Sequence, residues 1–333
     1  MVGEPQGKAA AARTQKVDLG RSFRLTGLAL IIFVVAVGLG TFLSGWREAQ
    51  SAIGELGASK LLILCVLAAA HYLIRALRWQ ILVRVGGVTT SVKENMLHFF
   101  GGFAMTATPG RIGELVRLRW LMRATGRGFG HLLPIAFADR AIELASIVGL
   151  IAIALIATNL GTSAAWWVLL AGFVMVWVTC RPLVLEKSVL GIWWMIGGRW
   201  GRLFVKLRRL TRRLKPFMRW PVMFPTLGIG VVGWALEGVA FWLLLDWLGA
   251  SIGLATAAAI FLIAVLSGAL SGLPGGLGGM EASAVGLLFL QGVPVDIAIL
   301  ATAIIRVTTL WFAVLIGFLV FPLAELGSSR KAT

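Results

Sequence analysis

The feature that most constrains this chain is the recurrence of long apolar runs. Runs of about 18 residues or more can cross roughly 30 Å of hydrocarbon as a helix. Backbone groups in a bilayer need hydrogen-bond partners within the protein, so only helices and closed barrels can span it. The runs predict an all-α, polytopic integral membrane protein with about six full transmembrane helices, near residues 25–45, 59–83, 131–158, 164–180, 223–248 and 296–322.

Composition excludes the classes that a strong positive charge would otherwise suggest. The chain carries 31 Lys and Arg against 14 Asp and Glu, a formal charge of +17, yet only 14% of its residues are charged. Soluble domains have about 25% charged residues, and nucleic-acid binders gather theirs on polar faces. We therefore expect no nucleic-acid partner. The longest segment between spans, 181–222, is too short and too basic for a soluble catalytic domain, which favours a transporter-like protein over an enzyme.

Cysteine and histidine give no sign of a metal or redox site. Cys65 and Cys180 lie inside apolar runs and form no CxxC pair, which is typical of cysteines that act as small hydrophobic residues. His71, His98 and His131 are scattered without ligand-like spacing. We expect no metal and no cofactor.

The distribution of basic residues predicts the topology. Lys and Arg gather in the tail 1–24 and in 109–130, and eleven lie in 181–222. The connections 159–163 and 249–253 contain none. The positive-inside rule places the basic group in the cytoplasm. We therefore expect a multi-pass protein of the bacterial cytoplasmic membrane with both termini, including the tail 323–333, on the cytoplasmic side.

Two apolar stretches are broken by Pro-Gly and predict re-entrant hairpins. Residues 92–127 would enter from the cytoplasmic face, and residues 253–292 would enter from the opposite face. Pro and Gly end one helix and allow another to begin. The alternative makes 254–272 a full span, which would place the basic C-terminal tail outside.

The same two stretches carry an internal repeat. Thr108–Glu114 reads TPGRIGE and Leu273–Glu281 reads LPGGLGGME, and each is followed 31 or 32 residues after its Pro by an arginine within a span, Arg140 or Arg306. With the topology above, repeat 1 (about 59–158) and repeat 2 (about 223–322) are inverted within one membrane domain, 25–322. Inverted repeats build transporters around a midplane site. The alternative is that PGxxG only breaks and packs helices.

Between the repeats lies a basic amphipathic segment at about 199–220. Apolar residues recur there at helical spacing, with a break near Pro216. Such a helix lies on a membrane surface, where each basic residue contributes about 1 kcal/mol against anionic lipid. It is either a topology anchor or a recruiter of lipid headgroups. The surface residues are Arg202, Lys206, Arg208, Arg209, Arg212, Arg213 and Lys215.

Ionisable residues inside spans are costly, so each is a candidate for function. Asp139, Arg140 and Glu143 lie within about one turn, and Arg140 and Glu143 can pair at i,i+3. Arg78, beside Trp79, is interpreted as reaching toward the interface. The alternative to a polar cavity is that these charges form only structural salt bridges. The other candidates at membrane depth are Arg75, Glu114, Glu237, Glu281 and Arg306.

These motifs together resemble the family named for the transmembrane region of lysylphosphatidylglycerol synthase, also called flippase-like or UPF0104. The resemblance rests on Leu77-Arg-Trp79, the two PG motifs, Asp139-Arg140 and the late Arg306. It implies a membrane protein that handles a lipid or lipid-linked headgroup. A translocation role would carry over to Arg111, Glu114, Arg140, Glu143, Glu281 and Arg306.

The leading hypothesis is therefore translocation of a phospholipid or lipid-linked headgroup through a midplane polar cavity between the hairpin tips. Alternatives are an embedded headgroup transferase with Asp139, Glu143 or Glu237 as base, and a scaffold that docks a separate lipid-modifying enzyme. The identity of the lipid and the oligomeric state do not follow from the sequence. The predicted headgroup site comprises Arg75, Pro109, Gly110, Arg111, Gly113, Glu114, Asp139, Arg140, Glu143, Glu237, Pro274, Gly275, Gly276, Gly278, Gly279, Glu281 and Arg306.

Overall fold

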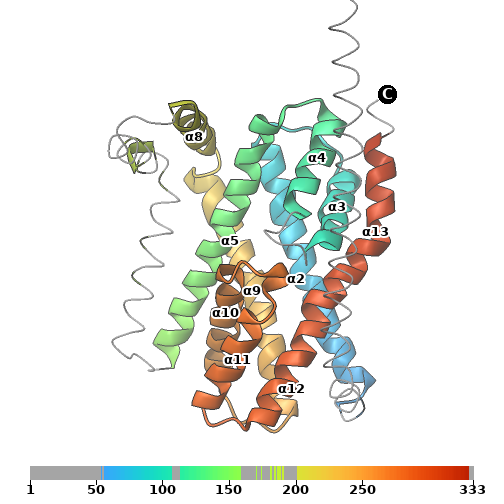
Figure 1. The fold of residues 1–333 in the computed structure, drawn as a ribbon, viewed down its shortest axis with the longest axis vertical. Coiled ribbons are helices and arrows are strands. Elements are labelled where there is room, and N and C mark those ends of the chain that lie inside the picture. Colours follow the sequence, from blue (N-terminus) through green and yellow to red (C-terminus); the bar gives the residue numbers. More distant parts are fainter. Residues whose placement is uncertain are drawn as a thin grey trace, which may run out of the picture. The chain divides into compact units, whose positions relative to one another are not determined.

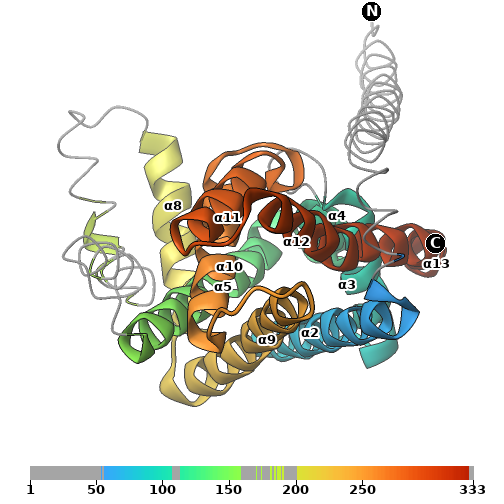
Figure 2. The same cartoon turned by 90° about the horizontal axis from the view of Figure 1, so that it is seen from below.

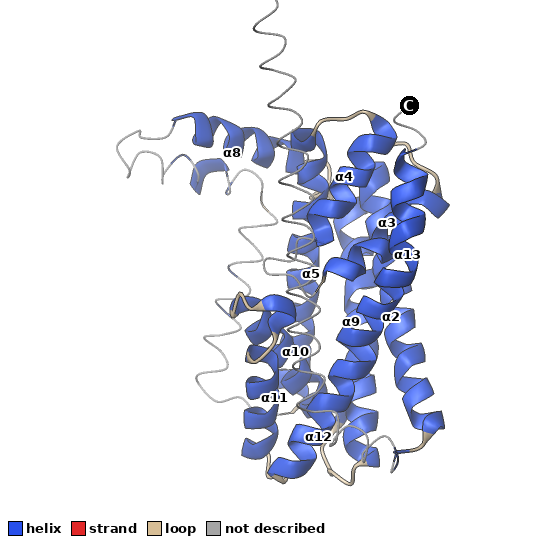
Figure 3. Cartoon of the chain, turned by 45° about the vertical axis from the view of Figure 1, so that its right-hand side comes forward, coloured by secondary structure: helices blue, strands red, loops and turns tan. Residues whose placement is uncertain are grey.

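The computed structural model describes residues 56–106, 113–158 and 201–329, with position 54 and scattered positions between 170 and 190. All of these lie in one compact unit, residues 48–333. Helices and the turns between them make up these segments, and no strand occurs within them (Figure 3). The all-α prediction is confirmed. The predicted spans 25–45 and 164–180 lie wholly or mostly outside the described residues.

Four helices are long and apolar enough to cross a membrane. They agree with four predicted spans to within a few residues at most ends. The last one continues past its predicted end at residue 322, because Glu325 in its final turns accepts a hydrogen bond from Trp120 at 2.7 Å. The four are α2 (Ala58–Val85), α5 (Phe129–Ala157), α9 (Trp220–Trp247) and the continuous run of α12 (Val295–Arg306), η4 (Val307–Trp311) and α13 (Phe312–Ser329).

Both broken stretches fold back on themselves. Figure 1 shows α3 and α4 together in one half of the bundle, and α10 and α11 together in the other half. The turn between α10 and α11 lies near the middle of the long helices, so the view of 254–272 as a full span is wrong for this structure. The elements are α3 (Val92–Gly101), η1 (Gly102–Met105) and α4 (Gly113–Thr125), then α10 (Leu254–Leu270), η3 (Pro274–Gly276) and α11 (Gly279–Leu290).

Local sequence explains where these short helices begin and turn. Ser91 and Glu94 form a capping box at the start of α3, which satisfies backbone N–H groups that have no partner within the helix. At the second turn, Gly276 has φ +69°, and a Cβ there would lie 3.1 Å from the backbone of Gly268. Glycine is needed at this point because α10 and the turn approach each other closely.

The last span joins the two halves. Its first part, α12, packs on α11, and its last part, α13, packs on α3, η1 and α4. Figure 2, seen from below, shows this span running past both hairpins. Between the parts lies the π-helical turn η4, directly after Arg306. The hydroxyls of Thr308 and Thr309 donate to the carbonyls of Ile304 and Ile305, at 3.1 and 2.6 Å, so acceptors around the turn gain partners from side chains.

Helix α8 (Gly201–Leu214) occupies most of the predicted amphipathic segment and ends two residues before Pro216. Figure 3 shows it lying across the direction of the long helices, at the end of the bundle where α4 and the last turns of α13 also lie. An amphipathic helix in this orientation suits a membrane surface better than a span.

Apolar side chains form two buried clusters. One is built around α9, α10, α11 and α12. The other is built around α2, α3, α4 and α5. Because each hairpin completes one cluster, the region where the clusters meet is the place where polar side chains can gather.

Candidate functional site

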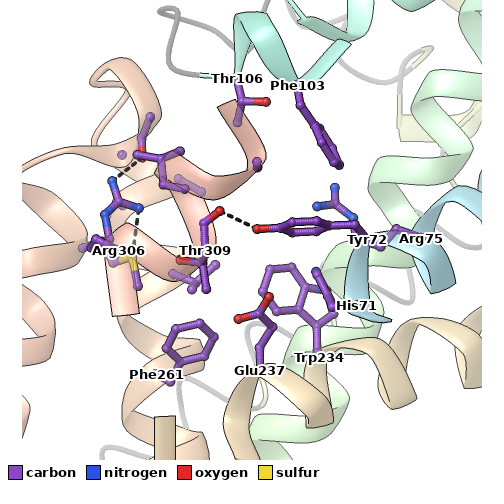
Figure 4. A pocket seen from close by; sticks show the side chains of 18 residues that line it. His71, Tyr72, Arg75, Phe103, Thr106, Trp234, Glu237, Phe261, Arg306 and Thr309 are labelled. Carbon is purple, nitrogen blue, oxygen red and sulfur yellow. Dashed lines mark hydrogen bonds between the residues drawn. The ribbon is translucent and has the colours of Figure 1, made fainter. Parts of the chain in front are cut away.

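A cavity of about 120 Å³ lies where the two clusters meet (Figure 4). Its walls come from α2, η1, α9, α10, η3, α11 and the last span, so both hairpins contribute. Ligand pockets combine apolar walls with a few placed polar groups. The charged and hydroxyl-bearing side chains here are Arg75, Glu237, Arg306, Tyr72, Thr106 and Thr309.

Beside the cavity, α2 and α5 share a buried charge network. Arg75 donates to both carboxylate oxygens of Glu143, at 3.0 and 3.2 Å. Arg78 donates to Asp139 at 2.8 Å and to Glu143 at 3.1 Å. Arg140 donates to Glu143 at 3.0 Å, as its i,i+3 spacing predicted. Three arginines against two carboxylates leave this network one positive charge in excess.

Arg78 corrects the sequence interpretation. It is fully buried, at 0% exposure, and does not reach toward an interface. The reason is that Asp139 and Glu143, one turn apart on α5, both face it and supply the counter-charge that a buried guanidinium requires. The i,i+3 spacing of Arg75 and Arg78 could have signalled this shared role.

Arg306 binds the turn of the second hairpin. Its Nη2 donates to the backbone carbonyl of Gly275 at 2.8 Å, and its Nε lies 2.6 Å from Glu281. Nη1 lies 3.2 Å from the sulfur of Met280. The planar fork of arginine suits several acceptors at once. The contact with Gly275 accounts for the distance between the PG motif and its arginine in the second repeat.

Glu237 is the exception among the carboxylates that face the centre of the bundle. It is 2% exposed, and its Oε2 has no hydrogen-bond partner in the described structure. Figure 4 shows its carboxylate directed into the cavity, with Phe261 and Trp234 beside it. A buried carboxylate without a partner is costly when ionised, which marks this residue as a candidate for function.

Aromatic residues form much of the cavity wall, and sequence reasoning did not select them. The Tyr72 hydroxyl donates to the backbone carbonyl of Thr309 in the π-helical turn. The His71 and Trp234 rings meet edge to face at 4.8 Å. Their only signal in the sequence was position, because His71 and Tyr72 lie one turn before Arg75.

Arg117 on α4 was taken as part of a basic cytoplasmic connection. The structure buries it at 3% exposure against aromatic rings, 4.1 Å from the Phe99 centroid and 5.5 Å from that of Phe103. Its Nε and Nη1 have no hydrogen-bond partner among the residues that the structure describes. A desolvated guanidinium is stabilised by aromatic faces. The first hairpin thus holds a positive charge close to the cavity wall formed by Phe103.

The structure brings together most of the predicted site that it describes. Pro274, Gly278 and Gly279 shape the turn without lining the cavity. Pro109, Gly110 and Arg111 lie outside the described residues. Gly113 and Glu114 begin α4, and only their backbone is described. The predicted residues that line the cavity are Arg75, Glu237, Gly275, Gly276 and Arg306. Those that support it through ion pairs are Asp139, Arg140, Glu143 and Glu281.

The described residues contain no set of side chains suited to bind a metal ion. Within segments 56–106, 113–158 and 201–329, no three His, Cys, Asp or Glu side chains gather closely enough to hold an ion. The carboxylates of the charge network face arginines instead, so the arrangement is suited to binding a charged or polar group.

Comparison with known proteins places this chain in a family. The family described as Lysylphosphatidylglycerol synthase TM region matches residues 24–317. A UPF0104 membrane protein of Methanothermobacter thermautotrophicus is 23% identical over 327 residues, covering 91% of this chain and 96% of that protein. A second UPF0104 match from the same organism is 33% identical over 98 residues, covering 28% of this chain and 29% of that protein. This chain therefore belongs to the lysylphosphatidylglycerol synthase TM region family.

Proposed function

We propose that this protein translocates an amphiphile with a phosphate-containing headgroup, and that the headgroup passes through the cavity between the two hairpins. The observation that carries the proposal is the placement of Arg75, Glu237 and Arg306 around one cavity at the centre of the bundle. Charged groups at membrane depth mark a substrate path by default. Non-helical backbone at that depth, as at Gly275, is tolerated where it lines a cavity.

The arginines supply the chemistry for an anionic headgroup. Arg75 and Arg306 each keep their main ion pair on one side and border the cavity on the other. Arginine is suited to phosphate because its fork can donate two parallel hydrogen bonds. A phosphate in the cavity would replace its hydrogen bonds to water with hydrogen bonds from these arginines, while the acyl chains of the lipid remain in the bilayer.

The arrangement of the hairpins supports alternating access. The two hairpins lie in opposite halves of the bundle and both contribute to the cavity, as expected for inverted repeats. In this proposal, α8 lies on the cytoplasmic face of a bacterial cytoplasmic membrane, its basic side chains contact anionic lipid, and both termini are cytoplasmic. The lipid could be supplied by a separate lipid-modifying enzyme.

The transferase alternative receives less support. It requires a free base, and two of its three candidates, Asp139 and Glu143, accept hydrogen bonds from arginines. Both carboxylates are therefore engaged by guanidinium groups, and neither lines the cavity. Glu237 remains as a candidate base, but no second carboxylate lines the cavity beside it among the described residues.

Translocation can be tested with purified protein in vesicles of phosphatidylcholine and phosphatidylglycerol. The probe is fluorescently labelled phosphatidylglycerol, and dithionite quenches the label only in the outer leaflet. We expect the protein to expose inner-leaflet label to the quencher. Arg306→Ala should reduce the rate at least tenfold, and Arg306→Lys should also reduce it, because lysine keeps the charge but cannot reach both Gly275 and Glu281.

The matched control is Arg123→Ala. Arg123 also pairs with a glutamate, Glu325, but neither residue lines the cavity, so its loss should leave the rate within about twofold. Wild-type vesicles that behave like empty ones with labelled phosphatidylglycerol, phosphatidylethanolamine and an isoprenoid phosphate would contradict the proposal. Equal rates for Arg306→Ala and wild type would show that the path lies elsewhere.

A further inference from the structure

Glu237 differs from the other carboxylates at the centre of the bundle in having no cation of its own. Asp139 and Glu143 pair with arginines of α2, and Glu281 pairs with Arg306. No ion pair joins Glu237 to any described residue, although its carboxylate points into the cavity. Its side chain is more than nine-tenths buried. The cavity therefore contains an acceptor without a donor.

The titratable and charged groups that line the cavity with Glu237 come from α2 and the last span. Helix α2 supplies His71, Tyr72 and Arg75, and the last span supplies Arg306. Helix α10 supplies only apolar side chains, Phe261 and Val265, at this level. Both arginines already bind other carboxylates, and the Tyr72 hydroxyl donates to the Thr309 carbonyl. The arginines and Tyr72 are therefore committed to other partners, and neither His71 Nδ1 nor Glu237 Oε2 has a hydrogen-bond partner in the described structure.

The charge balance of the interior depends on this one residue. Four arginines (Arg75, Arg78, Arg140 and Arg306) face four carboxylates (Asp139, Glu143, Glu237 and Glu281). The set is neutral when Glu237 is ionised and has one excess positive charge when Glu237 is protonated. Arg117 of the first hairpin adds a further positive charge nearby. With Arg117 counted, the excess is one positive charge when Glu237 is ionised and two when it is protonated, so a proton on Glu237 makes room for one further anionic charge.

We propose that Glu237 is a proton-binding site, and that its proton and an anionic phosphate headgroup occupy the cavity together. This inference rests on the proposed translocation and gives it a coupling ion. The carboxylate takes up a proton from water as the headgroup enters, and it returns the proton when the headgroup leaves. By linkage, the proton and the anion raise each other's affinity by the same factor.

The arrangement argues against a cationic group held directly by Glu237. Arg75 and Arg306 border the same cavity, and an ammonium group there would meet two like charges in a medium of low dielectric constant. A proton is small enough to neutralise the carboxylate without approaching either arginine. A cationic headgroup is kept as an outcome of the test below.

The first measurement is the pH dependence of translocation of labelled phosphatidylglycerol. If the proton is obligatory, the wild-type rate should fall about tenfold for each unit rise in pH once the carboxyl of Glu237 is mostly ionised. Glu237→Gln is permanently neutral, so its rate should change less than twofold over the same range. The control is Asp246→Asn, which removes an exposed carboxylate from the same helix and should keep the wild-type profile. A Glu237→Gln profile as steep as wild type would overturn the inference.

The second measurement does not need transport. Infrared difference spectra of wild type against Glu237→Gln, in phosphatidylglycerol vesicles, should show the carbonyl stretch of a protonated carboxyl that the variant lacks. Adding phosphatidylglycerol to protein in zwitterionic lipid should increase that band. If no such band occurs at any pH where wild type translocates, Glu237 is not the proton site.

Together the two measurements separate the failures. Wild-type protein that translocates no lipid refutes the proposed function, while the infrared band still decides whether Glu237 binds a proton. If labelled phosphatidylethanolamine moves at a pH-independent rate that Glu237→Gln abolishes, the residue binds a cationic headgroup, and the coupled-proton inference is wrong.

Discussion

The closest backbone approach found at a described glycine is at Gly317, and it leads to a sharp prediction about stability. A Cβ on Gly317 of α13 would lie 2.0 Å from the backbone nitrogen of Ala104 and 2.5 Å from the carbonyl carbon of Phe103. Ordinary contact begins at 3.4 Å, so Gly317→Ala requires α13 and η1 to separate by about 1.4 Å, the difference between 3.4 and 2.0 Å. Both sides are backbone, so no side chain can rotate away.

The magnitude follows from two opposing effects. Overpacking costs up to about 3 kcal/mol, and replacing glycine by alanine within a helix returns about 1 kcal/mol. We expect Gly317→Ala to lower the free energy of unfolding by about 2 kcal/mol. Gly327 lies on the same helix with nothing within 4 Å of its Cβ position, so Gly327→Ala should raise stability by up to about 1 kcal/mol.

The assay is thermal unfolding of purified protein in mild detergent, followed by tryptophan fluorescence. With an unfolding entropy of about 0.7 kcal/mol/K for 333 residues, the expected loss corresponds to a fall of roughly 3 °C for Gly317→Ala. Gly327→Ala should melt at or slightly above wild type. If Gly317→Ala melts no lower than Gly327→Ala, the tight packing of α13 against η1 is refuted.

Two further predictions concern charges. Arg78→Met leaves Asp139 buried without its partner and should cost about 3–5 kcal/mol, whereas adding Asp139→Leu should recover most of the loss; thermal melts of the cycle check this. At α8, hydrogen bonds from Arg208, with Arg212 also donating, lower the pKa of Glu186. That stabilisation is present above the ordinary pKa of glutamate and is lost as the pH falls through the lowered value. A spin label on α8 should therefore gain mobility in acid. In the Glu186→Gln variant, the label should be mobile at every pH.

Much of the fold could be predicted because a bilayer allows few solutions. A long apolar run such as 223–248 can cross the bilayer only as a helix in an all-α protein. The Pro-Gly pair within 253–292 marks a turn, because a straight helix cannot contain it. The extra turns of the last span could not be predicted. They depend on Trp120 and Arg123, distant in sequence, which bind Glu325.

The site was less predictable than the fold. The sequence identified charges at membrane depth, and Arg75, Glu237 and Arg306 do meet in one cavity. Apart from the pair of Arg140 and Glu143 within one helix, it could not identify partners, because pairing between helices depends on the rotation of each helix about its axis. Arg78 and Arg117 illustrate this: each looked like a residue near an interface, and each is buried once its helix packs.

The π-helical turn at the centre of the last span has a mechanical consequence. The last span packs on the second hairpin through α12 and on the first hairpin through α13. Its π-helical turn lies beside the cavity, where the Tyr72 hydroxyl donates to the Thr309 carbonyl. A change in direction at this turn would move α12 with the second hairpin and α13 with the first, on either side of the candidate site. Opening of the cavity toward one face would then be tied to closure toward the other by the covalent chain itself.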